Sequence, residues 1–293
     1  MKNSMAVGVD IGGSHITAAL VDLEDRSIIE GTWHRERING KGTVEEIIDA
    51  WTAVIKEVAA GLEGENIVIG IGMPGPFNYE DGISLMQNQE KFDALYGLNV
   101  KELLAARLHT SPKNIQFIND AGCFLQGEGF SGAARDFKSA IGLTLGTGLG
   151  SATFDGHLAK DADRWCTPFK ASIAEDYIST RWFIKRYAEI TGRTVKDVKA
   201  LTELMGEDTR IAGIFEEFGT NLGEFLVPFI QQERPEVVVL GGNIANAAAL
   251  FTPAVNNVLD SNNIHVPLRV AMLGESAAVI GAASVWYGEI VNA

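Results

Sequence analysis

The chain has 293 residues, of which 46% are hydrophobic, and its formal net charge at pH 7 is −14. That length is sufficient for one large domain or for two lobes of ordinary size. The acidic charge disfavours non-specific binding to nucleic acid, and no run approaches the roughly 20 apolar residues of a membrane span.

Cysteine usage and the first residues indicate a cytoplasmic protein. Only Cys123 and Cys166 occur, which supports neither a disulfide framework nor a cysteine-built structural zinc site. The start runs directly into a strand-like segment without the apolar region and cleavage site of a secretory signal.

Short apolar runs alternate along the chain with segments of helical periodicity. The predicted strands are residues 6–10, 16–23, 68–72, 115–119, 141–145 and 237–240. Apolar residues recur at helical spacing over 44–58, with Thr43 as N-cap and Gly61 as stop, and residues 172–233 and 275–290 are mostly helical. This alternation predicts an α/β fold.

A weak internal repeat relates residues 7–20 to residues 141–154. The identical pairs are Gly8 with Gly142, Gly12 with Gly146, and Ala18 with Ala152. A chance match of two glycine-rich hairpins is one explanation. The other, which we favour, is a duplicated nucleotide-binding unit in which each of two lobes offers one phosphate-facing hairpin to a shared cleft.

The first glycine turn follows a strand that ends in Asp10. Gly12, Gly13 and Ser14 form the turn, and glycine lets backbone N–H groups approach phosphate oxygens closely. Asp10 is placed to organise Mg²⁺, through water because this ion dehydrates reluctantly. An ordinary hairpin with a solvated aspartate is the alternative. His15 adjoins the turn and is the histidine for which we expect a phosphate contact.

Two more glycine motifs follow predicted strands. Their candidate nucleotide-binding residues are Thr144, Gly146, Thr147, Gly148, Gly241, Gly242 and Asn243. Threonine hydroxyls and small residues suit the transferring phosphate in the first motif. In the second, a helix begins at residue 243 or 244, and its N-terminus suits an adenosine or phosphate contact. Packed turns explain each motif alone, but explain the three together less easily.

A fourth glycine set, Gly70, Gly72 and Gly75, matches G-x-G-x-x-G without its structural context. Pro74 and Pro76 prevent the helix that a dinucleotide fold needs directly afterwards. No P-loop motif is present either. We expect this turn to shape the wall of a substrate pocket.

Asn119 and Asp120 stand at the end of a predicted strand and before a helix over 121–130. Strand ends that face a cleft are where α/β proteins place catalytic groups. We expect Asn119 to hydrogen-bond a substrate hydroxyl, and Asp120 to orient the attacking oxygen and accept its proton as general base. The alternative is that Asp120 is the helix N-cap, and the two roles need not exclude each other.

These motifs, taken in order, resemble the ROK family of sugar kinases and related repressors. The segments that carry the resemblance are DIGGSHI, GIGMPGPF, Asn88 in MQNQ, NDAG, LGTGLG and VVLGGNI, which span nearly the whole chain. The resemblance implies a two-lobed actin-like ATPase fold, ribonuclease H-like, with the ATP cleft between the lobes. We place an N-terminal lobe over 1–118 and a larger C-terminal lobe over 119–274, and the family analogy allows residues 275–293 to return to the first lobe.

The resemblance also implies ATP-dependent phosphorylation of a hexose or amino-sugar hydroxyl, with ATP and Mg²⁺ as cofactors and a homodimeric assembly. It implies phosphate contacts at Gly12, Gly13, Ser14, Thr147 and Gly148, and nucleotide contact near Gly242 and Asn243. The hexose contacts that it implies are Gly75, Asn88, Asn119 and Asp120.

Two family elements are not intact in this chain. The Glu-x-Gly-His element has no clear counterpart, and residues 166–175 align with the cysteine-rich zinc loop with only Cys166 and Glu175 kept. Pro168 and Ile173 take other cysteine positions. We therefore expect no zinc, a retained sugar contact at Glu175, and a substrate choice that need not be glucose.

Other functions stay open at this point. A catalytically weakened sugar- or nucleotide-binding protein is one, and an ATPase acting on a protein or other non-sugar partner is another, because fold alone does not set function. A DNA-binding repressor is not expected, since only about five residues precede the first strand.

Overall fold

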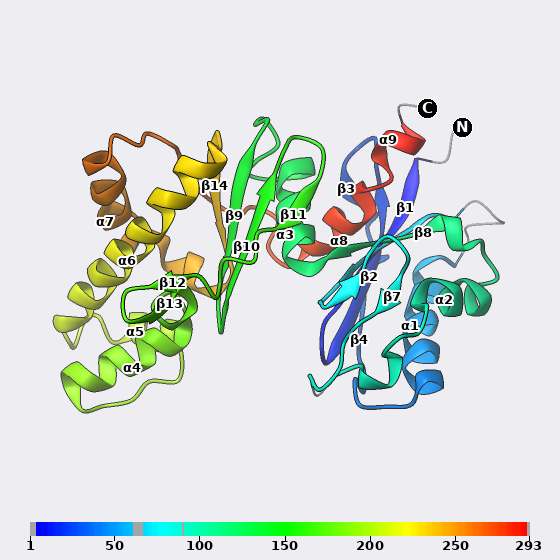
Figure 1. Cartoon of the computed structure of the whole chain (residues 1–293), viewed down its shortest axis with the longest axis horizontal. Helices are drawn as coiled ribbons and strands as arrows, with labels where there is room; N and C mark the ends of the chain where they lie inside the picture. The colour runs from blue at the N-terminus through cyan, green and yellow to red at the C-terminus, as the bar shows by residue number, and fades with distance from the viewer. Residues whose placement is uncertain (1–3, 61–66, 90, 292–293) are drawn as a thin grey trace. The chain divides into compact units, whose positions relative to one another are not determined.

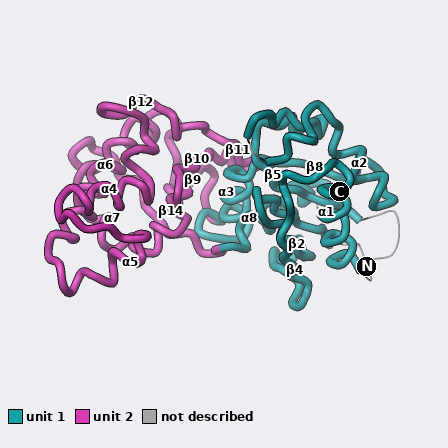
Figure 2. The backbone as a smooth tube through the Cα atoms, turned by 90° about the horizontal axis from the view of Figure 1, so that it is seen from below, with its two compact units in different colours: residues 1–135, 275–293 teal, residues 136–274 magenta. Residues whose placement is uncertain are grey.

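The computed structural model describes residues 4–60, 67–89 and 91–291. The chain forms two compact units, residues 1–135 with 275–293, and residues 136–274 (Figure 1, Figure 2). Each unit contains its own mixed sheet. Gly61, where we expected the first helix to stop, lies outside the described residues.

The sheet of the first unit has the strand order β3–β2–β1–β5–β8, with β4 also paired to β2. Its strands are β1 (Met5–Ile11), β2 (His15–Asp22), β3 (Ser27–Ile28), β4 (His34–Arg37), β5 (Ile69–Met73) and β8 (Ile115–Asn119). A separate small hairpin joins β6 (Phe77–Asn78) and β7 (Ile83–Ser84). The strands predicted from the sequence in this unit are confirmed, with small shifts at their ends.

The helices of the first unit come from both ends of the chain. They are α1 (Val44–Val58), α2 (Val100–Leu108), α3 (Asp120–Ser131), α8 (Ser276–Ser284) and α9 (Tyr287–Ile290), with short 3₁₀ turns η1 (Asp93–Leu95) and η2 (Pro112–Asn114). Thr43 caps α1 in a complete capping box with Glu46, which confirms the predicted start.

The sheet of the second unit has the order β11–β10–β9–β14–β15. Its strands are β9 (Ala140–Leu145), β10 (Leu149–Phe154), β11 (Ala159–Asp161), β14 (Val237–Gly241) and β15 (Leu268–Val270), and β12 (Pro168–Phe169) pairs with β13 (Ser172–Ile173) separately. The helices are α4 (Thr180–Thr191), α5 (Val198–Glu203), α6 (Arg210–Glu233) and α7 (Ala248–Ser261), with 3₁₀ turns η3 (Ala174–Asp176) and η4 (Asn243–Ala247). In Figure 1, α6 and α7 lie beside each other, and they share a core with β9 and β14.

The two sheets follow one topology, which agrees with a duplicated unit. In each, the first strand pairs antiparallel with the next and parallel with a later one: β1 with β2 and β5, and β9 with β10 and β14. The gapless alignment of residues 7–20 with residues 141–154 matches equivalent positions only as far as the turn. Ala18 pairs with Val9, whereas Ala152 pairs with Gly142, because the second turn is one residue shorter.

Backbone-to-backbone packing on one face of the first sheet decides where α3 and α8 belong. A Cβ atom on Gly8 would lie 2.1 Å from the carbonyl oxygen of Val279 in α8, and one on Gly70 would lie 1.8 Å from that of Ala282. On the opposite face, Val9 shares a core with Trp51 of α1. Gly70, part of the rejected dinucleotide motif, therefore serves close packing.

Helix α3 packs in turn on α8, where a Cβ atom on Gly281 would lie 1.9 Å from the carbonyl oxygen of Cys123. The division of the chain consequently differs from the boundary that we placed near Asn119. Residues 119–135 group with the first unit, as do residues 275–293. No helix within the described part of the chain is long and apolar enough to cross a membrane.

Candidate functional site

The turn between β1 and β2 is the predicted first phosphate turn. The N–H of Gly12 donates to the carbonyl oxygen of His15 at 2.9 Å, and the N–H of Ile38 donates to that of Ser14 at 3.0 Å. Ser14 Oγ and His15 Nδ1 lie 2.9 Å apart. Gly13 and Ser14 are exposed. Backbone hydrogen bonds thus fix the base of the turn, while its tip is exposed to solvent.

Asp10 lies just before this turn, on the sheet face that packs against α8, because it is two residues beyond Gly8. Burial raises the pKa of Asp10 from 3.8 to about 6, and the negative charges of Asp120 and Glu275 add to this effect, while Arg35 opposes it. Arg35 and Glu275 form an ion pair at 3.1 Å. The structure therefore brings two predicted site carboxylates, Asp10 and Asp120, into one electrostatic environment.

Asn119, and not Asp120, caps α3. Its Oδ1 accepts hydrogen bonds from the N–H groups of Ala121 at 2.9 Å and Gly122 at 3.2 Å. The alternative in which Asp120 is the N-cap is wrong. Asp120 is the first helical residue and is exposed, with its Oδ1 accepting from the N–H of Ala121 at 2.9 Å. The general-base candidate thus presents its carboxylate at the end of β8.

Tyr79 is a further candidate site residue, which no sequence motif indicated. Asn119 Nδ2 donates to Tyr79 Oη at 3.0 Å, and that hydroxyl donates to the carbonyl oxygen of Met73 at 3.1 Å. A Cβ atom on Gly75 would lie 3.3 Å from the same hydroxyl. Tyr79 therefore joins the Gly75 turn to Asn119, and only the folded structure reveals this connection.

Two further residues complete the surroundings in the first unit. Asn88 is exposed and left-handed, with φ of 58°, in the loop before η1. Cys123 is buried beneath the carboxylates, and burial raises the pKa of its thiol well above the ordinary value, with Asp10 and Asp120 adding to the shift. Cys123 is accordingly a neutral packing residue.

In the second unit, Glu175 supports the turn between β9 and β10. The N–H of Gly146 donates to the carbonyl oxygen of Gly148 at 3.0 Å, and the N–H of Leu149 donates to Glu175 Oε2 at 3.0 Å. A Cβ atom on Gly148 would lie 2.5 Å from that oxygen. Arg181 pairs with the same carboxylate. Glu175 therefore supports this turn, and the sugar contact that we expected of it stays a prediction.

The third glycine motif lies beside the second. Gly241 of β14 pairs with Thr144 of β9. In the first unit the equivalent pair, also near the carboxyl ends of its strands, is Gly72 with Asp10. Gly242 has a φ of 81°, and a Cβ atom there would lie 2.4 Å from the carbonyl oxygen of Leu145. Asn243 is exposed and begins η4, a 3₁₀ turn that precedes α7. Thr144, the exposed Thr147 and Asn243 of the second unit therefore lie at or just beyond the carboxyl ends of β9 and β14.

The segment that aligns with the zinc loop forms the β12–β13 hairpin, in which Pro168 pairs with Ile173. Lys170 at its turn approaches Asn221 Oδ1 at 2.5 Å and Glu224 Oε2 at 3.0 Å. Its ammonium group also lies over the rings of Phe169 and Tyr177. Within the residues that the structure describes, no group of three His, Cys, Asp or Glu side chains could hold a metal ion.

Comparison with known proteins adds the family. Glucokinase from Thermotoga maritima is 28% identical over 97% of this chain and 98% of that protein. The N-acetylgalactosamine kinase AgaK from Shewanella sp. is 25% identical over 97% of each. A ROK family glucokinase from Streptomyces griseus, solved in complex with glucose and AMPPNP, superposes with a TM-score of 0.72 at 22% identity and covers 96% of this chain and 98% of that one.

The likeness to that solved structure confirms the expected actin-like ATPase fold. A model of the ROK family matches residues 6–161 and 155–289. Because these two matches together span nearly the whole chain, the protein belongs to the ROK family.

Proposed function

We propose that this protein transfers the terminal phosphoryl group of ATP to a hydroxyl of a small sugar, with Asp120 as general base. The observation that carries the proposal is the exposed carboxylate of Asp120, which lies near Asp10 and the first glycine turn. Asn119 caps α3, so the Asp120 carboxylate is not needed as the helix cap. The names of the relatives from Thermotoga maritima and Shewanella sp., a glucokinase and an N-acetylgalactosamine kinase, support a sugar as acceptor.

In this proposal the acceptor hydroxyl lies between Asp120 and the amide of Asn119. Asp120 orients the hydroxyl and accepts its proton as the bond to phosphorus forms. Tyr79 holds the Asn119 amide, so the donor that faces the sugar is fixed before the sugar binds. We assign further sugar contacts to Gly75, Asn88 and Glu175.

The proposed nucleotide contacts are the glycine turns. They comprise Gly12, Gly13, Ser14, His15, Thr144, Gly146, Thr147, Gly148, Gly241, Gly242 and Asn243. The AMPPNP bound to the Streptomyces griseus glucokinase supports an adenine nucleotide as donor. Asp10 fits Mg²⁺, because its carboxylate has a raised pKa and sits beside a second carboxylate, an environment that a cation would relieve. Bound there, Mg²⁺ would neutralise phosphate charge.

Two further features belong to the proposal. We expect no zinc, because only Cys166 remains of the aligned cysteines and the Lys170 ammonium links the hairpin to α6. We also expect a homodimer, which light scattering of the purified protein would test.

The experiment that tests the proposal is ADP release from Mg-ATP across a panel of hexoses, N-acetylhexosamines and pentoses. We expect sugar-dependent release in the natural protein and a loss of at least about 100-fold in Asp120→Asn, because a general base contributes about 10²–10⁴-fold. ATP binding should persist in the variant. Asp25→Asn, the same change at an exposed site on the β2–β3 turn, is the control. Near-normal turnover in Asp120→Asn would refute the assigned base.

A binding protein without turnover is the second candidate. It is favoured by the missing Glu-x-Gly-His element and by the Glu175 carboxylate, which the Leu149 N–H and Arg181 already occupy. Sugar or ATP would then raise the melting temperature without any ADP release.

A further inference from the structure

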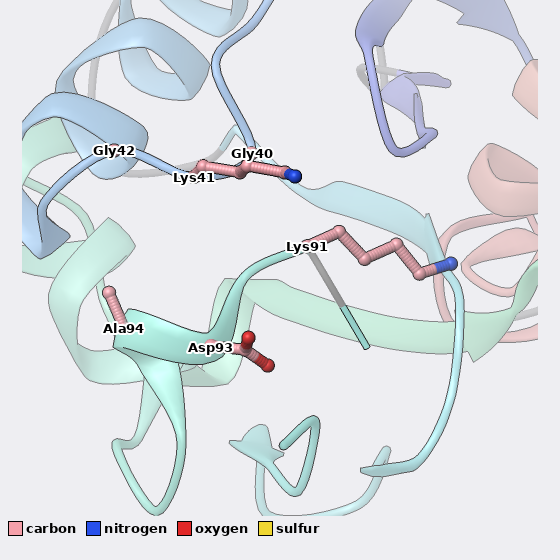
Figure 3. Close-up of a pocket in the computed structure, with 6 residues that line it drawn as sticks. All are labelled: Gly40, Lys41, Gly42, Lys91, Asp93 and Ala94. Atoms are coloured by element: carbon pink, nitrogen blue, oxygen red, sulfur yellow. The ribbon is translucent and has the colours of Figure 1, made fainter. Parts of the chain in front are cut away.

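A cavity of about 340 Å³ lies in the first unit between the loop that precedes α1 and the turn that carries η1 (Figure 3). It is lined by Gly40, Lys41, Gly42, Lys91, Asp93 and Ala94. The volume is at the lower end of the range for small-molecule sites. None of these residues belongs to the motifs that define the proposed kinase site.

Two of the residues that line the cavity carry ammonium groups. Two lysines and one aspartate line it, although the chain as a whole carries a formal charge of −14. Figure 3 shows the side chains of Lys41 and Lys91 extending from facing loops in the same direction. Asp93 Oδ1 accepts a hydrogen bond from the N–H of Gln89 at 3.2 Å. Ammonium groups arranged in this way attract carboxylates and phosphates.

The cavity adjoins the first phosphate turn. A Cβ atom on Gly13 would lie 3.4 Å from Cδ of Lys91, and one on Gly40 would lie 2.9 Å from the carbonyl oxygen of Gly13. The N–H of Phe92 donates to the carbonyl oxygen of Gly40, at 2.6 Å. The Lys91 side chain therefore lies along the turn that we assign to phosphate, and a hydrogen bond joins the two walls.

The same wall continues into the loop of Asn88, because Asp93 holds the N–H of Gln89. A ligand group in the cavity would thus lie between a residue assigned to the sugar and a turn assigned to phosphate. We propose that this cavity binds an anionic group, a carboxylate or a phosphate, of a small molecule, and that Lys41 and Lys91 supply its counter-charge.

The inference rests on the proposed function only for the source of that group. The anion is either an acidic substituent of the acceptor sugar or the phosphoryl group of the donor. Anion binding in the cavity does not require turnover, so binding is measured first and catalysis second.

Binding is tested by melting temperature as a function of inorganic phosphate and of glucuronate, with glucose as the neutral probe. The variants are Lys41→Met, Lys91→Met and the double variant, and Lys56→Met on the exposed side of α1 is the matched control. We expect apparent phosphate affinity to fall about tenfold in each single variant, to vanish in the double variant and to persist in the control. Equal affinity in the natural protein and the double variant would overturn the proposal.

Turnover and AMPPNP titration then separate the two sources. If the anion belongs to the acceptor, Lys91→Met raises KM for glucuronate and leaves both KM for glucose and the affinity for AMPPNP unchanged. If it belongs to the donor, affinity for AMPPNP falls instead. Lysine-dependent phosphate binding without any sugar-dependent ADP release would support the cavity and refute the kinase proposal, so the two failures are distinguishable.

Discussion

Asp10 illustrates at the residue scale how a site can oppose stability. Its carboxyl is drawn out of water on the glycine-lined face of β1, close to Asp120, and its pKa is raised to about 6. An ordinary aspartate in the unfolded chain titrates near 3.8. Since the folded state binds this proton more tightly than the unfolded state, ionised Asp10 costs stability that a neutral side chain would not.

We therefore expect Asp10→Asn to increase the free energy of unfolding at pH 7 by about 2 kcal/mol and to abolish turnover. The stabilisation should be largest above about pH 6 and should disappear below about pH 4, where Asp10 is protonated in both states. Urea unfolding of both proteins between pH 4 and pH 8 measures this difference. A pH-independent difference would show that packing, and not ionisation, distinguishes the two.

At the scale of elements, contact between backbones holds the site carboxylates in place. Gly8 and Gly70 admit α8 onto the sheet, and Gly281 admits α3 onto α8. Asp120 begins α3 and Glu275 directly precedes α8, so the two carboxylates that raise the pKa of Asp10 lie at the starts of helices that glycine packing positions. A methyl group at one of these glycines must push α8 away from the sheet or from α3, because the opposing atoms are backbone.

Gly281→Ala should accordingly destabilise the protein by about 3 kcal/mol and reduce turnover, through overpacking against Cys123. Gly288→Ala is the matched control, because a Cβ atom there meets nothing within 4 Å and alanine is the better helix former. Urea unfolding compares the two variants. Equal stability of the two would mean that α3 and α8 separate at little cost.

At the scale of the whole molecule, the two units differ in how the chain builds them. The second is one continuous segment, residues 136–274, with a core that includes Phe183, Phe218 and Phe251. The first needs residues 275–293 from the far end of the chain, because α8 covers the glycine-lined face of its sheet.

Removal of residues 275–293 should therefore prevent the first unit from folding and leave the second intact. A segment of residues 136–274 should unfold cooperatively when expressed alone. A chain that ends at residue 291 keeps α8 and α9 and serves as the control. Thermal unfolding followed by circular dichroism distinguishes the cases. A chain of residues 1–274 that melts like the control would show that α8 is dispensable.

Local pattern was enough for the main elements and for the turns on which the proposed site residues lie. Apolar periodicity predicted the main strands and α1, and turn chemistry predicted three glycine turns and the strand end at Asn119 and Asp120. These features depend on residues close together in the chain, so they can be recognised from the sequence alone. The family resemblance rests on the same local motifs, and the family match confirms it.

Contacts between distant segments could not be predicted in this way. Tyr79 meets Asn119, Lys91 meets Gly13, and Glu175 supports the turn at Gly148, and none of these pairs has a characteristic spacing. The boundary near Asn119 was misplaced for the same reason, since the contact of α3 with α8 joins residues that lie far apart along the chain. Periodicity specifies which face of an element is apolar, but the partner that covers this face is selected by packing in three dimensions.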